Sequence, residues 1–218
     1  MPHSDSSLPT SHHSEKGWLE IAFSMPSTPY VIGVILWVLS WWAQMGPLRP
    51  LLNFAPGVEL PFFPAGVRTL AVFIFGIHGA IAIFIGSLIT YSLYFPELLS
   101  ASPIGIIGCA AASAFSSYLA MRIVCTVCKI PHSLDGLNLR NITWIVITQG
   151  LISASLHQLI YRWEVIAPAG DTLGSHSGLI NWAAMVSGDT TGSMLVLLAI
   201  LAVYDLYQRQ RHRRGASL

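Results

Sequence analysis

The chain has 218 residues, of which 53% are hydrophobic and only 10% are charged, and its mean hydropathy is +0.61. Soluble domains carry about 25% charged residues, so this composition excludes an ordinary soluble protein. The formal net charge of +1 excludes a strongly basic nucleic-acid-binding protein, and no nucleic-acid partner is predicted. Several apolar runs approach the ~20 residues that a helix needs to cross a bilayer core. The composition predicts an all-α protein, a polytopic transmembrane helix bundle of about six spans whose first partner is the lipid bilayer.

Polar segments flank the predicted membrane domain. Residues 1–26 are rich in Ser, Pro and His and lack the charged-then-apolar order of a signal peptide, so they are expected to form a disordered cytoplasmic tail. Residues 27–207 form the predicted integral membrane domain, and residues 208–218 form a basic cytoplasmic tail. Apolar runs place the helices at Ser27–Met45, Ala65–Phe75, Ala80–Phe95, Pro103–Val124, Ile142–Tyr161 and Leu179–Tyr207.

The second and third predicted helices come from a single apolar run. This run, from Pro64 to Phe95, is too long for one membrane-spanning helix. The sequence GIHG, at Gly76–Gly79, is expected to divide it into a tight hairpin of two helices, the first of them short. The number of spans depends more on this division than on any other.

The distribution of basic residues predicts the topology. Lys and Arg are enriched in the cytoplasmic loops of membrane proteins. With six spans, the C-terminus and the connection between the fourth and fifth helices share the side of the N-terminus, and both are basic. We therefore predict a multi-pass protein of the bacterial inner membrane with both termini in the cytoplasm. The residues behind this prediction are Arg122, Lys129 and Arg140 in the connection, and Arg209, Arg211, Arg213 and Arg214 near the C-terminus.

Small residues recur every four positions in the third and fourth predicted helices. Such stripes let helices approach closely in lipid. Tight packing inside the bundle is favoured over a homodimer contact, which stays open as the alternative, because polytopic bundles use the same pattern. The stripes consist of Ala82, Gly86 and Thr90, and of Gly108, Ala112, Ser116 and Ala120.

Two stretches carry the resemblance to a known family. They are FFPAGVRTLAVFIFGIHGAIAIFIGSLIT and, much later, INWAAMVSGDTTGSMLVLLAILAVYDL. Both resemble the signature regions of the membrane-associated sensor (MASE-type) domain family, in which an aromatic-Pro-x-Gly motif starts a helix hairpin and a Trp precedes Gly-Asp-x-x-Gly. The resemblance covers about Pro61–Tyr204. The matching residues are Phe63, Pro64, Gly66, Gly76, Gly86, Ser87, Trp182, Gly188, Asp189 and Gly192.

The resemblance implies a sensory function. Members of that family are polytopic bacterial inner-membrane domains, usually fused ahead of a histidine kinase or a diguanylate cyclase, and often have around eight spans. Here six spans are predicted, and only eleven residues follow the last of them, so a separate kinase or cyclase is the expected partner. We expect a non-enzymatic module that perceives a small ligand or a membrane signal.

Two other classes of function stay open. A small-solute uptake component is the main alternative, since the substrate-binding subunits of energy-coupling-factor transporters are similar in size and number of spans. A membrane enzyme that uses His157 and Asp189 is less favoured.

Three polar residues inside the predicted helices are the first candidates for a site. At 1.5 Å per residue, Arg68 and His157 lie roughly 6 Å from the outer ends of their helices, and Asp189 lies roughly 15 Å deep. All three fall in the outer half of the bilayer, so we predict an ion pair between Arg68 and Asp189 that neutralises the arginine. The alternative is that Arg68 extends to the interface without a specific role. His157 is either a packing residue or a ligand-binding or proton-sensing residue.

Three further candidates come from the matched motifs. Pro64, Gly66 and Trp182 could shape the mouth of a cavity. Equally, Pro64 only starts a helix and Gly66 only permits close packing.

Neither a metal nor a cofactor is predicted. Cys125, Cys128 and His132 form C-x-x-C-x-x-x-H, but a structural zinc site needs four ligands and no fourth is nearby. The pair also faces the reducing cytoplasm in the predicted topology, which argues against a disulfide function. The sequence GSHSG, at residues 174–178, has His176 where a nucleophile elbow has serine, so it does not indicate a hydrolase.

Overall fold

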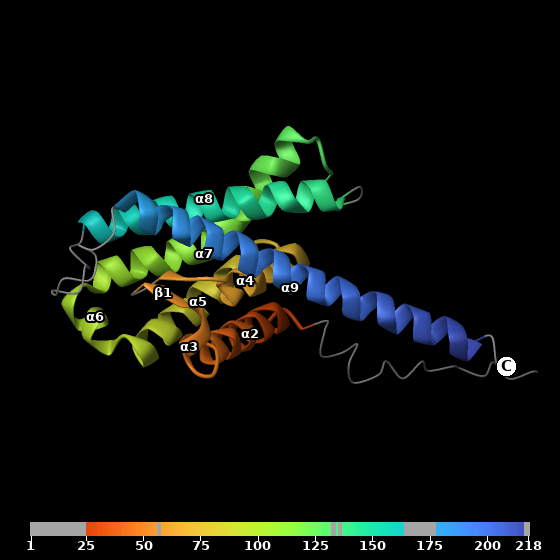
Figure 1. Cartoon of the computed structure of the whole chain (residues 1–218), viewed down its shortest axis with the longest axis horizontal. Helices are drawn as coiled ribbons and strands as arrows, with labels where there is room; N and C mark the ends of the chain where they lie inside the picture. Colours follow the sequence, from red (N-terminus) through yellow and green to blue (C-terminus); the bar gives the residue numbers. More distant parts are fainter. Residues whose placement is uncertain (1–24, 56–57, 132–133, 135–136, 164–177, 216–218) are drawn as a thin grey trace, which may run out of the picture.

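The computed structural model of the protein describes residues 25–55, 58–131, 134, 137–163 and 178–215. These residues form a bundle of helices with one short pair of antiparallel strands (Figure 1). The helices are α2 (Thr28–Met45), α3 (Arg49–Leu52), α4 (Phe63–Phe75), α5 (Ile77–Tyr94), α6 (Pro96–Ala101), α7 (Pro103–Val127), α8 (Leu139–Trp163) and α9 (Gly178–Gly215), and the strands are β1 (Asn53–Ala55) and β2 (Val58–Glu59).

The longer helices run back and forth along the bundle. Tyr30, near the start of α2, bonds to His78, near the start of α5, so these two helices are parallel. The other longer helices alternate: Trp182, near the start of α9, bonds to Ser155, near the end of α8. The starts of α2, α5 and α8 and the ends of α4 and α7 therefore share one end of the bundle, here called the Val127 end. The opposite end, where α4, α7 and α9 begin, is called the Gly178 end.

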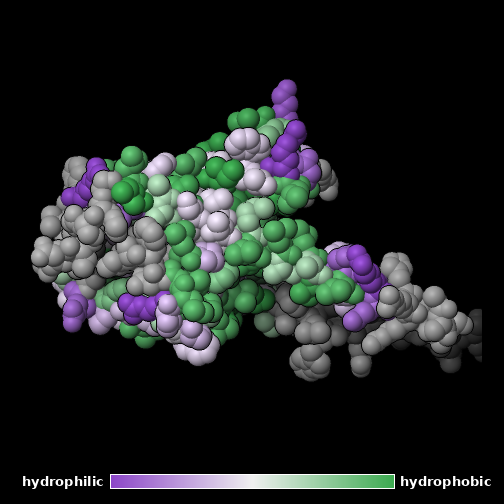
Figure 2. Space-filling model, in the orientation of Figure 1, coloured by the Kyte–Doolittle hydropathy of each residue, from purple (hydrophilic) through white to green (hydrophobic). Residues whose placement is uncertain are grey.

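Besides an apolar core, this bundle buries many polar side chains and exposes many large apolar ones. The buried polar residues include Gln44, Arg68, Gln149 and Asp189, whereas large aliphatic residues of every longer helix face outward. On the face shown in Figure 2, hydrophobic surface covers the middle of the bundle and hydrophilic surface gathers toward its ends and the far part of α9. A soluble protein has the opposite arrangement, because water favours exposed polar groups. The bundle is built for an apolar surrounding.

Four helices of the described part of the chain are long and apolar enough to cross a membrane. They are Thr28–Met45, Ile77–Tyr94, Pro103–Val127 and Gly178–Gln210 within α9. The predicted helical membrane bundle is thus confirmed at the level of these four spans, with α4 as a shorter apolar helix. The predicted fifth span corresponds to α8, which is less apolar because it carries inward-facing polar residues such as Gln149 and His157.

The predicted hairpin at GIHG is confirmed. α4 ends at Phe75, α5 begins at Ile77, and Gly76 between them has a φ of +58°, a left-handed conformation that glycine adopts without strain. A Cβ atom on Gly79 would overlap the carbonyl oxygen of Ala71, so the second glycine lets the two helices meet closely. Two glycines therefore account for the tight turn.

The connection between α2 and α4 enters the bundle from the Gly178 end. Neither α3 nor the two strands were expected from the apolar runs. Gln44 at the end of α2 fixes the start of α4: its Nε2 donates to Pro61 O, and its Oε1 accepts from the Phe63 amide, both at 3.2 Å. The Phe62 amide donates to Gly188 O of α9 at 3.0 Å. Since Gly188 lies about 15 Å along α9 from Gly178, α4 begins well inside the bundle.

The last helix is far longer than the bundle. α9 has 38 residues, which corresponds to about 57 Å, and it extends past the other helices at the Val127 end (Figure 1). The apolar run predicts its end at Tyr207, but the helix continues to Gly215. The predicted basic cytoplasmic tail, residues 208–218, is therefore helical as far as Gly215, and its location stays a prediction. Residues 1–24 lie outside the described residues, so the predicted N-terminal tail stays a prediction.

Candidate functional site

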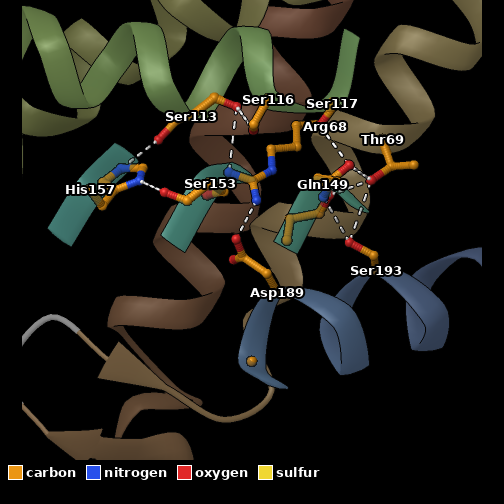
Figure 3. A network of polar contacts seen from close by, with 12 residues as sticks. Arg68, Thr69, Ser113, Ser116, Ser117, Gln149, Ser153, His157, Asp189 and Ser193 are labelled. Atoms are coloured by element: carbon orange, nitrogen blue, oxygen red, sulfur yellow. Dashed lines mark hydrogen bonds and ion pairs between the residues drawn. The ribbon is translucent and has the colours of Figure 1, made fainter. Parts of the chain in front are cut away.

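A buried ion pair joins α4 to α9. Arg68 Nη2 lies 2.5 Å from Asp189 Oδ2, and the two side chains are 1% and 8% exposed (Figure 3). The predicted contact between Arg68 and Asp189 is present. The alternative, in which Arg68 extends to the interface, is wrong, because the guanidinium is enclosed by neighbouring helices. A buried charge needs such a partner, since removing a charge from water is costly.

The position of α4 explains how the two residues meet. Counting from the helix ends puts Arg68 about 6 Å deep and Asp189 about 15 Å deep. That count assumes that α4 begins at the membrane surface, and the assumption is wrong, because the residue before α4 bonds to Gly188 of α9. Arg68 is therefore deeper than predicted and lies level with Asp189.

Hydrogen bonds connect the Arg68–Asp189 pair through α7 to α8. Arg68 Nη1 donates to Ser113 O at 3.4 Å, and Ser113 Oγ lies 3.3 Å from His157 Nε2 (Figure 3). His157 Nδ1 is 2.8 Å from Ser153 O. Because a carbonyl only accepts, Nδ1 carries a proton, and Nε2 faces the Ser113 hydroxyl. His157 thus belongs to the site through Ser113. We name Arg68, Asp189, Ser113, Ser153 and His157 the charged layer.

A second polar cluster lies one helical turn away, and its centre, Gln149, was not predicted. Gln149 Oε1 accepts from the hydroxyls of Thr69 and Ser117, both at 2.6 Å. Gln149 Nε2 donates to Ala65 O at 3.2 Å and to Ser193 Oγ at 3.1 Å. These four bonds fill the hydrogen-bonding capacity of the amide. Gln149, Thr69, Ser117 and Ser193, all shown in Figure 3, are called the neutral layer.

The sequence does contain a signal for the neutral layer. Gln149 stands in an otherwise apolar run, and a polar side chain inside a membrane helix needs a partner. Nothing in the spacing of residues identifies Thr69, Ser117 and Ser193 as those partners, because each belongs to a different helix.

The other predicted site residues pack helices together. Gly66 is buried, and a Cβ atom there would overlap the side chain of Val196 on α9. Pro64 is buried in the first turn of α4, where proline fits the start of a helix. Trp182 Nε1 donates to Ser155 Oγ at 3.0 Å, which joins α9 to α8 nearer the Gly178 end. These contacts favour packing over the mouth of a cavity, and binding by these residues stays a prediction.

The cysteines do not form a metal centre with other described residues. Cys125 and Cys128 are free thiols. Within the described ranges, no group of three or more His, Cys, Asp or Glu side chains could hold a metal ion. His132 and His176 lie outside the described residues, so the predicted absence of a metal site stays a prediction.

The two motif stretches that resemble the membrane-associated sensor family meet in the structure. The Phe62 amide donates to Gly188 O, and a Cβ atom on Gly192 would overlap the Phe62 backbone. The glycines therefore let the start of α4 contact α9. Comparison of the chain with protein-family models, with curated proteins and with solved structures gives no match. The resemblance consequently rests on these residues alone.

Proposed function

We propose that the protein is a sensory module of a bacterial inner membrane, in which the Arg68–Asp189 pair is the switch. One observation carries the proposal: α9 holds Asp189 at the buried pair and continues without a break to Gly215, beyond the Val127 end. A change at the pair can therefore displace a surface far from it. A separate histidine kinase or diguanylate cyclase would read that displacement in the cytoplasm.

The physical basis is a shift between two arrangements of the bundle. A ligand shifts such an equilibrium only by its difference in affinity for the two states. Separating Asp189 from Arg68 removes the strongest attraction between α4 and α9 in the charged layer. α9 would then pivot about the neutral layer, which still holds Ser193 to Gln149. Small movements of packed helices are a common form of such transitions.

The proposal includes six membrane crossings with both termini in the cytoplasm. α8 is long enough to cross, and its buried polar side chains contact α7 and α9. α4 is short, at about 20 Å against a bilayer core of about 30 Å, and the connection from α2 occupies the rest of its path. A phosphatase that works only in the periplasm should be inactive when it is fused after Leu218, because the fusion would stay in the cytoplasm. An active fusion would refute this topology.

A distance measurement tests the switch. Spin labels are placed on Cys128 and on a Gln210→Cys variant, both exposed at the Val127 end, after Cys109 and Cys125 are changed to alanine. Roughly 26 Å of helix separates the pivot at Ser193 from residue 210, so a tilt of about 5° moves the label by about 2 Å. Double electron–electron resonance on the full chain in lipid nanodiscs should show such a shift in Asp189→Asn.

The matched control is Asp205→Asn on the same helix. Asp205 forms an exposed pair with Arg209, one turn apart, with side chains 58% and 71% exposed. Exposed pairs contribute little, so this change should leave the distance as in the parent protein. An unchanged distance in Asp189→Asn would contradict the proposed switch.

The irregular connection before α4 favours one alternative function, the transport of a small solute. Transporters bind substrates where helices are interrupted near the middle of the membrane, and α4 begins well inside the bundle. Vesicles containing the purified protein separate the two functions. A transporter accumulates solute in the vesicles, whereas a sensor binds without net flux.

A further inference from the structure

Arg68 has more hydrogen-bond donors than its neighbours satisfy. A guanidinium has five N–H donors and no acceptor. Two hydrogen bonds use these donors: Nη2 donates to Asp189 Oδ2, and Nη1 donates to Ser113 O at the long distance of 3.4 Å. Among the residues that the structure describes, none accepts a hydrogen bond from the buried Arg68 Nε. A buried donor of a charged group that lacks an acceptor is costly, so the site is short of an acceptor.

The unused donor lies on the edge that contacts Asp189. Nε and Nη2 form one edge of the planar guanidinium and point in the same direction. A carboxylate that lies flat against this edge accepts two parallel hydrogen bonds, which is the strongest geometry for this pair of groups. Asp189 Oδ2 contacts Nη2, while Nε stays unpaired, so Asp189 uses half of that edge. A second carboxylate with freer approach could use both donors.

The burial of the pair and the backbone beside it indicate from which end a solute could approach this edge. Of the two side chains in the pair, Asp189 is the more exposed, at 8% against 1% for Arg68. The non-helical backbone before α4 reaches the level of Gly188, next to Asp189. In the proposed membrane arrangement, backbone of this kind is stable only where protein buries it or where it lines water. A small solute from the outer side would therefore meet Asp189 first and Arg68 behind it.

We propose that Arg68 binds the carboxylate of a small organic acid through its Nε–Nη2 edge, in place of Asp189. The incoming group takes the Nη2 contact and the unpaired Nε, and Asp189 is released from α4. This inference rests on the proposed function of the pair as a switch, because it identifies the ligand class that would operate it. The binding step is non-covalent, and Arg68 stays protonated throughout, since its guanidinium does not lose its proton in proteins.

Thermal unfolding of the full chain in lipid nanodiscs tests the ligand class with three probes. Acetate is the smallest carboxylate, inorganic phosphate is a tetrahedral anion, and chloride at matched ionic strength measures the effect of salt alone. Acetate should raise the unfolding temperature of the parent protein, and chloride should not. In Arg68→Lys the acetate effect should disappear, because an ammonium lacks the two-donor edge. Arg209→Lys, an exposed control on α9, should keep the full effect.

A second variant keeps the test decisive if Arg68→Lys does not fold. Asp189→Asn retains Arg68 but removes the competing charge, so acetate should bind about tenfold more tightly, as expected when a competing state loses most of its population. Titration calorimetry measures this change. Equal effects of acetate and chloride, or binding to Asp189→Asn no tighter than to the parent, would overturn the proposal. Stabilisation by phosphate alone would also overturn it and assign the site to tetrahedral anions.

The spin-label distance separates this inference from the proposed switch. If acetate does not bind but Asp189→Asn still displaces α9, the carboxylate assignment fails and the switch stands. If acetate binds without displacing α9, the binding site stands and the switch fails.

Discussion

The charged layer and the neutral layer draw on the same four helices. α4 contributes neighbouring residues, Arg68 and Thr69, and the other helices contribute residues one turn apart. These residues are Ser113 and Ser117 on α7, Ser153 and Gln149 on α8, and Asp189 and Ser193 on α9. The layers have similar burial and the same neighbours. They differ in charge and in how fully their hydrogen bonds are satisfied.

This difference separates a structural contact from a changeable one. Every hydrogen-bonding position of the Gln149 amide is used, so any rearrangement of the neutral layer loses bonds without replacing them. In the charged layer Arg68 Nε is unpaired, and the Arg68–Asp189 contact uses one oxygen. Six other buried side-chain atoms of the described residues also lack a partner, but Arg68 Nε is the one that belongs to a charged group, for which a missing acceptor costs most. We infer that the neutral layer fixes the helices and the charged layer responds.

The largest expected effect comes from breaking the ion pair on one side. Arg68→Leu and Asp189→Leu should each destabilise the protein, because each leaves an uncompensated buried charge, at a typical cost of about 3–5 kcal/mol. The double variant should recover part of the loss, since replacing both partners by apolar groups can be neutral. Thermal unfolding in detergent measures all three. Strictly additive losses would mean that the two side chains do not interact, and the comparison of the layers would fail.

Much of this architecture is predictable from the sequence, and the remainder has physical causes. The hairpin at Gly76 was predictable because glycines interrupt one long apolar run. The contact between Arg68 and Asp189 was predictable because isolated charges in apolar helices need each other. The depth of Arg68 was not, since it depends on the Phe62–Gly188 bond between distant segments. The side-chain partners of Gln149 were not predictable either, because three hydroxyl groups on three other helices leave no local pattern.

A smaller effect is expected from separating α4 and α9 without changing a polar group. In Gly192→Ala the new methyl group would overlap the Phe62 backbone, which cannot move aside as a side chain can. Overpacking of this kind typically costs about 1–3 kcal/mol. Both layers bridge α4 and α9, so this change should destabilise the protein and also displace the spin label on α9.

Gly108→Ala is the matched control for that change. Its Cβ atom would lie 3.3 Å from Ile160 Cδ1, the flexible end of a side chain. We expect thermal unfolding close to that of the parent protein. If both alanine variants lose the same stability, the contact of α4 with α9 has no special importance.

Removing the centre of the neutral layer should cost stability without moving α9. Gln149→Leu keeps a similar volume but removes four hydrogen bonds, and the Thr69 hydroxyl can then donate to Ala65 O, which lies 2.8 Å away. Because the hydroxyls of Thr69, Ser117 and Ser193 that remain can bond within their own helices, the cost should be about 1–2 kcal/mol. Gln208→Leu, which changes the same residue type outside the bundle, should cost less than about 0.5 kcal/mol. A label shift as large as that of Asp189→Asn would remove the distinction between the layers.

The smallest effect is expected at the cysteines, which test whether any polar site outside the two layers matters. Cys125 lies in the last turn of α7 and Cys128 directly follows that helix, at the Val127 end and away from both layers. Replacing both by serine removes two thiols without changing charge, so the unfolding temperature and acetate binding should stay as in the parent protein. Elemental analysis of the purified variant and parent provides the independent measurement. A metal present in the parent and lost from the variant would contradict the prediction. The Val127 end, past which α9 extends, would then be a third functional region beside the two layers.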